Sequence, residues 1–152
     1  MFYIILMAVM VAADQAEKYL ISHTMELYET IPVVGDLFRI TYIHNTGAAF
    51  GMMAGMRWIL CALPIVVAAV MIAIIFRYRG RTGRTALVAL SMIAAGGIGN
   101  VIDRIRLGYV VDMFDLKNFA VFNVADIFVC VGCGLLALYM ILSDRRGEKR
   151  GR

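Results

Sequence analysis

Four apolar stretches, separated by polar segments, dominate the sequence. They cover approximately residues 2–21, 58–76, 86–104 and 121–142. A bilayer core accommodates a helix of about 20 mostly apolar residues, so each stretch is long enough to span a membrane. The first stretch lacks a basic N-terminal region, and its polar positions continue in a helical pattern. We therefore expect a retained helix there and not a cleaved signal peptide.

The longest connection, residues of about 23–56, has the pattern of a small β-structure. Residues 37–43 read LFRITYI, a run of β-branched and aromatic residues with rough alternation that is typical of a strand. Pro32 and Gly35 precede this run and indicate a turn. We predict a single domain, residues 1–152, of the membrane all-α class. It is a four-transmembrane-helix bundle with a small extracytoplasmic β-sheet, or cradle, and a loop.

The composition favours a membrane protein and argues against nucleic-acid binding. Hydrophobic residues make up 62% of the chain, well above the roughly 45–50% that is usual for soluble domains. The formal net charge is +4. Most of the basic residues, however, lie at the ends of the apolar stretches, where they report membrane orientation and not a polyanionic partner.

Basic residues gather on one side of the predicted membrane. Four arginines between residues 77 and 84, and five basic residues in the tail at 143–152, mark the cytoplasmic side. Nine of the eleven acidic residues lie on the other side. With four spans, both termini are predicted to be cytoplasmic. The connections at 22–57 and 103–126 are predicted to face outward.

The cysteines and histidines do not form a recognisable metal site. Cys61, Cys130 and Cys133 all lie inside apolar runs. Cys130 and Cys133 form a C-x-x-C, but it falls within a predicted span and has no second ligand pair at metal spacing. His23 and His44 are isolated in the sequence. We expect no metal and no cofactor.

Polar residues inside apolar segments are the main functional signal, because a charge in the bilayer is costly and usually serves a purpose. The predicted topology places all of these polar residues near the outer membrane interface. Four segments thus bring polar groups to one depth. The residues concerned are Asp14, Lys18, Asn45, Asn100, Asp103, Arg104, Asp112, Asn123 and Asp126.

Some of these residues also have a purely structural interpretation. Asp14 and Lys18 are spaced i, i+4 with the acid first, which is the favourable order for a helical ion pair. Asp103 and Arg104 could simply end a helix at the membrane interface. Both interpretations stay open at the level of the sequence.

Asp112 and Asp126 suggest acid–base chemistry. They are separated by one short connection, which can fold back and bring the two carboxylates together. Two close carboxylates share a proton, so one can act as a general base on water and the other as an acid. Asn123 and Asp126 could instead cap a helix. A different function is also open: the chain could be a small transporter that uses the two carboxylates as cation ligands and not as an acid and a base. A further alternative is an inactive peptidase-like binding protein.

Four motifs occur in order along the chain. They are DQAEK at 14–18, NTGAAF at 45–50, GGIGNVIDRIRLGYVVD at 96–112 and FNVAD at 122–126. Together they resemble the lipoprotein signal peptidase family (signal peptidase II) over nearly the whole chain. The chain departs from the family pattern at Met113, where Phe is usual, and its 112–126 connection is short for the family.

The resemblance implies an activity and roles for individual residues. It implies an aspartic endopeptidase of the bacterial plasma (inner) membrane that removes the signal peptide from diacylglyceryl-modified prolipoproteins, cleaving just before the lipidated cysteine. Asp112 and Asp126 match the catalytic aspartates. Residues matching positions that line or support the site are Asn45, Gly47, Asn100, Arg104 and Asn123, and those that hold it together are Asp14, Lys18 and Asp103. The resemblance also implies inhibition by globomycin-type peptides. We expect a monomer with its site near the outer face.

Overall fold

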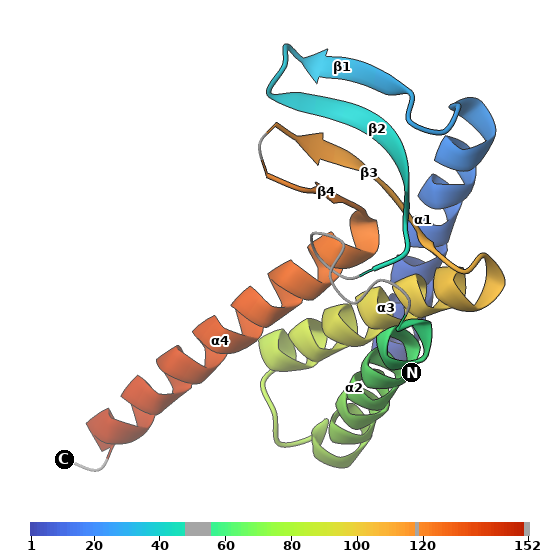
Figure 1. The fold of residues 1–152 in the computed structure, drawn as a ribbon. Coiled ribbons are helices and arrows are strands. Elements are labelled where there is room, and N and C mark those ends of the chain that lie inside the picture. The colour runs from blue at the N-terminus through green and yellow to red at the C-terminus, as the bar shows by residue number, and fades with distance from the viewer. Residues whose placement is uncertain (48–55, 118, 151–152) are drawn as a thin grey trace.

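The structure is a computed structural model that describes residues 1–47, 56–117 and 119–150, with side chains as far as residue 144. It contains four helices and a four-stranded sheet within these residues (Figure 1). In chain order the elements are α1 (Phe2–Thr24), β1 (Thr30–Val34), β2 (Phe38–Asn45), α2 (Arg57–Tyr78), α3 (Arg84–Arg106), β3 (Val110–Leu116), β4 (Val121–Phe122) and α4 (Val124–Arg150). The predicted combination of a four-helix bundle with a small sheet is confirmed.

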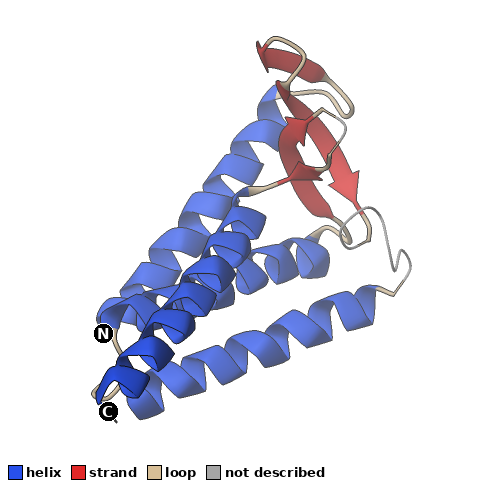
Figure 2. Ribbon diagram, turned by 90° about the vertical axis from the view of Figure 1, so that its left-hand side faces the viewer, coloured by secondary structure: helices blue, strands red, loops and turns tan. Residues whose placement is uncertain are grey.

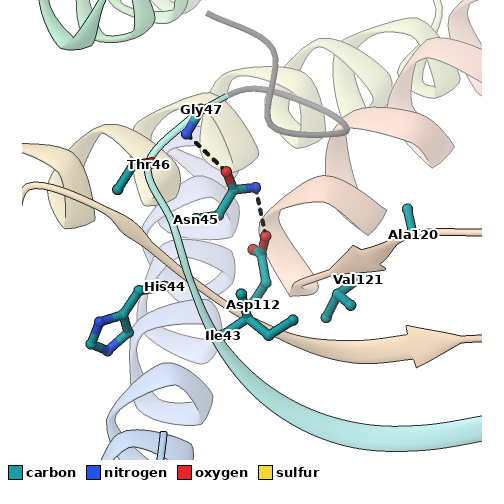
Figure 3. Close-up of a pocket in the computed structure, with 8 residues that line it drawn as sticks. All are labelled: Ile43, His44, Asn45, Thr46, Gly47, Asp112, Ala120 and Val121. Atoms are coloured by element: carbon teal, nitrogen blue, oxygen red, sulfur yellow. Dashed lines mark hydrogen bonds between the residues drawn. The ribbon is translucent and has the colours of Figure 1, made fainter. Parts of the chain in front are cut away.

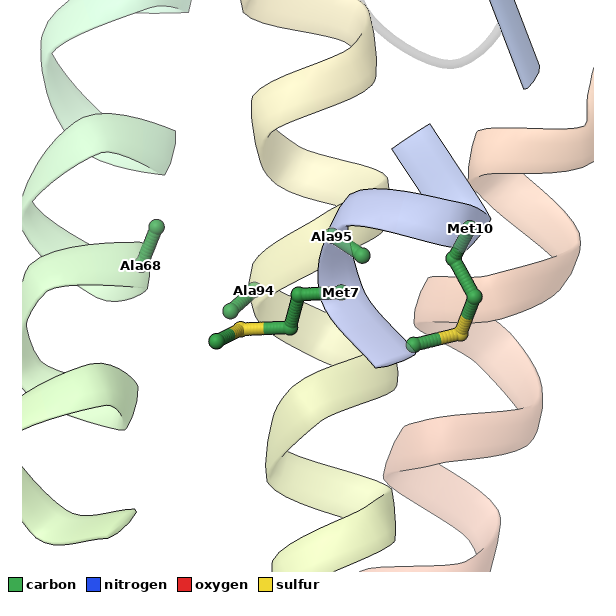
Figure 4. Packing of buried hydrophobic residues seen from close by; sticks show 5 residues of the cluster. All are labelled: Met7, Met10, Ala68, Ala94 and Ala95. Atoms are coloured by element: carbon green, nitrogen blue, oxygen red, sulfur yellow. The ribbon is translucent and has the colours of Figure 1, made fainter. Parts of the chain in front are cut away.

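Helix α3 is the centre of the bundle and contacts α1, α2 and α4. The apolar stretch of α3 is 67% buried inside the protein, against 17% for α2 and 11% for α4. Met7 and Met10 of α1 meet Ala94 and Ala95 of α3 in one apolar cluster, which Ala68 of α2 completes (Figure 4). Small side chains on α3 therefore let the other helices approach it closely.

Three helices of the described chain are long and apolar enough to cross a membrane: α2, α3 and α4 as far as Asp144. Helix α1 is equally long but carries Asp14, Glu17 and Lys18 in its second half. Asp14 and Lys18 are 1% and 3% exposed, so the charges of these two residues are enclosed by protein. Charged groups in a spanning helix usually face the bundle interior in this way.

The sheet is antiparallel, with the strand order β1-β2-β3-β4 (Figure 1), and it stands at one end of the helical bundle (Figure 2). The sequence predicted a strand at 37–43, close to β2, but it did not predict β3 and β4. Val111 and Met113 of β3 are buried with Tyr42 of β2. Ile21 from the end of α1 packs against this cluster. The connection at 103–126, predicted as a plain loop, therefore supplies half of the sheet.

The last helix starts three residues after its predicted start and continues beyond its predicted end. Helix α4 begins at Val124 and not at 121, because residues 121–122 form β4. The predicted tail from 143 onward continues the helix to Arg150, consistent with the good helix propensity of Arg, Glu and Lys. The other three helices differ from the predicted bounds by at most three residues.

Candidate active site

Asp112 lies on β3, close to the point where the sheet meets the bundle, and its side chain is 2% exposed. Its two carboxylate oxygens accept hydrogen bonds from two asparagines. Asn45 Nδ2 on β2 donates to Oδ2 at 2.8 Å, and Asn123 Nδ2 donates to Oδ1 at 2.7 Å. The carboxylate is thus oriented from two different segments of the chain.

A bulge in β2 contributes to this arrangement. The register pairs Ile40 with Phe114 and Ile43 with Asp112, so β2 has one extra residue between these pairs. Beyond the bulge, Asn45 becomes the diagonal neighbour of Asp112. Its Oδ1 accepts a hydrogen bond from Gly47 N at 2.9 Å, which turns its amide nitrogen toward the carboxylate (Figure 3).

Asp126 and Asn123 form a reciprocal cap at the start of α4. Asp126 N donates to Asn123 Oδ1 at 3.0 Å, and Asn123 N donates to Asp126 Oδ2 at 3.2 Å. This is the pattern of a capping box, with an aspartate at its third helical position. The structural interpretation of the two residues is therefore right. It is also incomplete, because Asn123 contacts Asp112 as well.

Asn100 of α3 links this pair to the bundle. Its Nδ2 donates to Asp126 Oδ1 at 2.8 Å. Its Oδ1 accepts from Lys18 Nζ at 2.9 Å and from Asn123 Nδ2 at 3.1 Å. Since an ammonium can only donate, Lys18 fixes which end of the Asn100 amide faces Asp126.

Lys18 uses all three of its donors within the protein. Besides Asn100, its ammonium contacts Asp14 Oδ2 at 3.1 Å and Asp103 Oδ2 at 3.0 Å. The two aspartates in turn hold other elements. Asp14 Oδ1 accepts from Ala125 N in the first turn of α4, and Asp103 Oδ2 accepts from Val111 N on β3. The buried cluster therefore joins α1, α3, α4 and the sheet.

Arg104 and Gly47 also come together at this site. Arg104 Nη2 donates to the Gly47 carbonyl at 2.8 Å. The guanidinium thus holds the turn that follows Asn45. The buried Nε of Arg104 has no hydrogen-bond partner among the described residues. Residues 48–50, the remainder of the NTGAAF motif, lie outside the described residues.

Burial and the neighbouring charge alter the acidity of Asp112. Its pKa rises from 3.8 to about 6, and desolvation by burial is the largest cause. The hydrogen bond from Asn45 opposes this rise, while the charge of Asp126 adds to it. The hydrogen bond from Asn123 lowers the pKa again to a smaller extent. A carboxyl group in this position can hold a proton close to neutral pH.

A cavity of about 290 Å³ opens beside Asp112 (Figure 3). Segments from β2, β3 and the approach to β4 line it; the residues are Ile43, His44, Asn45, Thr46, Gly47, Asp112, Ala120 and Val121. Asp112 therefore forms part of the cavity wall. Nowhere in the described chain do three or more metal-binding side chains gather.

One contributor to the site was not among the residues singled out from the sequence. Gln15 Nε2 contacts Asp103 Oδ1 at 2.9 Å, Asp14 Oδ2 at 3.1 Å and the Gly99 carbonyl at 3.2 Å. It braces the two aspartates that hold Lys18. Its place in the DQAEK motif was the available signal.

Comparison with known proteins gives a consistent result. The family model for signal peptidase (SPase) II matches residues 6–142. A lipoprotein signal peptidase of Geobacter metallireducens is 46% identical, with 95% of this chain and 93% of the relative covered. That of Halothermothrix orenii is 38% identical, with 97% and 100% covered.

A solved structure also resembles the fold. It is a bacterial membrane enzyme determined by the in meso method, and it superposes with a TM-score of 0.87 at 28% identity. The match covers 94% of this chain and 89% of the solved one. The likeness therefore includes the sheet as well as the helices.

Proposed function

We propose, from the premise that this chain belongs to the signal peptidase II family, that Asp112 and Asp126 are its catalytic pair. The chain is a multi-pass membrane protein of bacteria and an aspartic peptidase that removes signal peptides from prolipoproteins. This membership decides against the transporter alternative. The observation that carries the assignment of the pair is that one residue, Asn123, hydrogen-bonds to both aspartates.

The proposed chemistry needs one proton shared by the two carboxylates. The ionised member accepts a proton from water as the water oxygen attacks the scissile carbonyl. The protonated member gives its proton to the carbonyl oxygen, which forms a neutral tetrahedral intermediate. When the C–N bond breaks, the carboxyl group that took the proton from water gives it to the leaving nitrogen. The other carboxylate takes a proton from a hydroxyl of the intermediate, so the signal peptide leaves with a new carboxyl group and the pair again shares one proton.

The remaining site residues are proposed to position this pair. Asn45 and Asn123 fix the carboxylate plane of Asp112, and Asn100 fixes that of Asp126. Preorganised groups of this kind lower the reorganisation needed during reaction. The cluster of Asp14, Lys18 and Asp103 supports Asn100 and the start of α4, while Arg104 holds the turn at Gly47.

The preferred substrate is proposed to be a prolipoprotein that carries diacylglycerol on the cysteine just after the scissile bond. The site lies where the helices meet the sheet, so acyl chains can stay in the lipid while the peptide reaches Asp112 (Figure 2). The charge distribution supports cytoplasmic termini and a site at the outer face of the plasma membrane. A monomer and inhibition by globomycin-type peptides remain parts of the same proposal.

The test compares Asp112→Asn and Asp126→Asn with wild type in cleavage of a purified diacylglyceryl-modified prolipoprotein. Each variant should lose about 10³-fold in rate, because the proton transfer that a carboxylate performs is worth up to about 10⁴-fold. Asp115→Asn is the matched control. It lies on the same strand and pairs with Arg39, away from the site, so its rate should stay within about threefold of wild type.

The outcome is decided by the pattern across the three variants. Mass spectrometry of the fragments should place the cut just before the lipidated cysteine. Near-normal activity in a folded Asp112→Asn or Asp126→Asn protein would remove that residue from the catalytic pair. Equal cleavage of the unlipidated precursor would overturn the proposed substrate preference.

A further inference from the structure

The four strands carry a continuous apolar row. The register pairs Ile31 with Ile40, Ile40 with Phe114, and Phe114 with Phe122. Residues paired directly across antiparallel strands share one face of the sheet. Ile31, Ile40, Phe114 and Phe122, called the apolar row below, therefore cross the whole sheet on one face.

Aromatic contacts support this assignment of the face. The rings of Phe114 and Phe122 lie 5.7 Å apart between centroids, and Phe38 stacks on Phe114 at 6.0 Å. Phe38 is the diagonal neighbour of Phe114 and extends the row by one step along the sheet. Aromatic pairs at these distances form a cohesive apolar surface.

Asp112 lies on the same face as the apolar row. It is two residues before Phe114 on β3, and side chains two apart on a strand point the same way. The opposite face in this part of the sheet is polar. There Arg39 and Thr41 bind the Asp115 carboxylate, and Thr30 contacts Thr41. Nearer the bundle, the opposite face carries Val111 and Met113, which are buried in a cluster against the end of α1. The face that carries Asp112 is therefore the one whose apolar row is left partly uncovered.

The apolar row is incompletely covered by the described protein. Ile40, Phe114 and Phe122 are only half-buried although Ile40 and Phe114 stand on the two central strands. Ile31 on the edge strand is 45% exposed. A side-chain surface of this composition gains stability when an apolar ligand covers it.

The geometry of the chain suggests which ligand covers it. Strand β3 follows α3 and runs away from the bundle (Figure 1), and Phe114 comes two residues after Asp112 along this strand. A signal peptide helix must lie in the membrane beside the helices. With the scissile bond at Asp112, the part of the substrate after that bond leaves in the direction of the apolar row.

We infer that the apolar row binds the second to fourth residues after the scissile bond and favours apolar side chains there. This inference rests on the proposed function of Asp112. Phe114 follows Asp112 by two positions on β3, a distance of about 7 Å along the strand. An extended substrate covers the same distance in two residues. The row thereby sets a sequence preference on the mature side of the cut, separate from recognition of the lipid.

The peptide is favoured over the bilayer as occupant because the row is continuous with Asp112 and with the cavity beside it. The cavity is lined by Asp112 and by Ile43, its cross-strand partner, which lie on the same face of the sheet as the row. A peptide seated at the cavity can therefore reach the row along one face of the sheet. Covering by acyl chains or by the outer leaflet would not depend on the residues that follow the cut.

The test uses two diacylglyceryl-modified prolipoproteins that differ only after the lipidated cysteine. One has Gly-Ser-Gly at the second to fourth positions after the bond, and the other has Leu-Phe-Leu. In direct competition, wild type should prefer the apolar substrate by about tenfold in kcat/KM, a typical gain for an added apolar contact. In Phe114→Ala this ratio should fall toward one.

Leu37→Ala is the matched control, since Leu37 is exposed at the turn between β1 and β2 and lies outside the row. It should keep the wild-type ratio. An equal rate for both substrates in wild type would overturn the inference and leave the catalytic pair intact. If wild type cleaves neither substrate, the proposed function itself fails. If kcat/KM instead depends on the length of the substrate's acyl chains and not on the residues after the lipidated cysteine, the row binds lipid.

Photo-crosslinking keeps the inference testable should Phe114→Ala misfold. A substrate with benzophenylalanine at the second position after the bond is bound to Asp126→Asn protein. Crosslinks are expected in the peptides that contain Ile40, Phe114 or Phe122. Crosslinks confined to the helices would contradict the inferred path of the substrate.

Discussion

At the scale of single residues, the site is built from side chains that each serve two partners. Asp126 caps α4 through the backbone of Asn123 and accepts from Asn100. Asp14 pairs with Lys18 and also caps the backbone at Ala125. One carboxylate can therefore cap a helix and also serve as a catalytic group, because each of its oxygens has more than one lone pair.

Sequence motifs predicted which residues matter but not how they are connected. The i, i+4 spacing predicted the pair of Asp14 and Lys18, and the structure contains it. Nothing in the spacing predicts that Asp14 reaches Ala125, 111 residues away. Such contacts depend on how α1 and α4 dock on α3, which local sequence does not encode.

Lys18→Met should strongly destabilise the protein. The substitution leaves Asp14 and Asp103 buried without their cation, and breaking a buried pair in this way costs about 3–5 kcal/mol. The thermal unfolding midpoint in detergent should fall by several degrees. Lys117→Met is the control, because Lys117 and Asp36 form an exposed pair, and it should change the midpoint little. Equal midpoints for the two variants would contradict the structural role of Lys18.

At the scale of elements, regular apolar segments were predictable and polar strands were not. The helices α1, α2 and α3 lie within three residues of their predicted bounds. Strand β3 was missed because Asp112 and Asp115 interrupt its apolar pattern. Each of these aspartates is buried and hydrogen-bonded, and this compensation is visible only in the folded sheet.

The contact between α3 and α4 depends on the absence of a side chain at Gly96. A Cβ there would overlap the Ala125 carbonyl and would come within 2.7 Å of Val129. Ala125 is next to Asp126, so a displacement of α4 also moves the proposed catalytic pair. Helix packing and site geometry are thus coupled at this position.

Gly96→Ala should lower both stability and activity, with a cost of about 1–3 kcal/mol that is usual for overpacking. Gly97→Ala is the neighbouring control. Its Cβ would meet Pro64 at 3.5 Å, an ordinary contact, and alanine has the better helix propensity. Thermal unfolding and cleavage rates should therefore separate the two variants. Identical behaviour would show that α3 and α4 are not tightly docked at Gly96.

At the scale of the whole molecule, a helical bundle and a four-stranded sheet meet at the cluster around Lys18. The number of helices followed from the hydrophobicity along the chain. The faces of the sheet did not, because they depend on the register between distant strands; Arg39 and Asp115, which hydrogen-bond across it, are 76 residues apart. Long-range pairing of this kind is specified by tertiary packing.

The proposed orientation is testable by cysteine labelling in intact spheroplasts, with the three native cysteines replaced by alanine. A membrane-impermeant maleimide should label Leu37→Cys, at the turn between β1 and β2, without permeabilisation. Asp144→Cys, at an exposed position in the last part of α4, should react only after the membrane is opened. The reverse pattern would place the sheet in the cytoplasm and contradict the charge argument.

The pH dependence of kcat/KM for a diacylglyceryl-modified prolipoprotein tests the central claim most directly. A pair that shares one proton is active only when one carboxylate is ionised and the other protonated. Because burial raises the pKa of Asp112 to about 6, its proton is present below that pH and is lost as the pH rises. The profile should be a bell whose descending limb lies well above the ordinary carboxyl range. A rate that keeps rising to a plateau at alkaline pH would contradict the shared-proton pair.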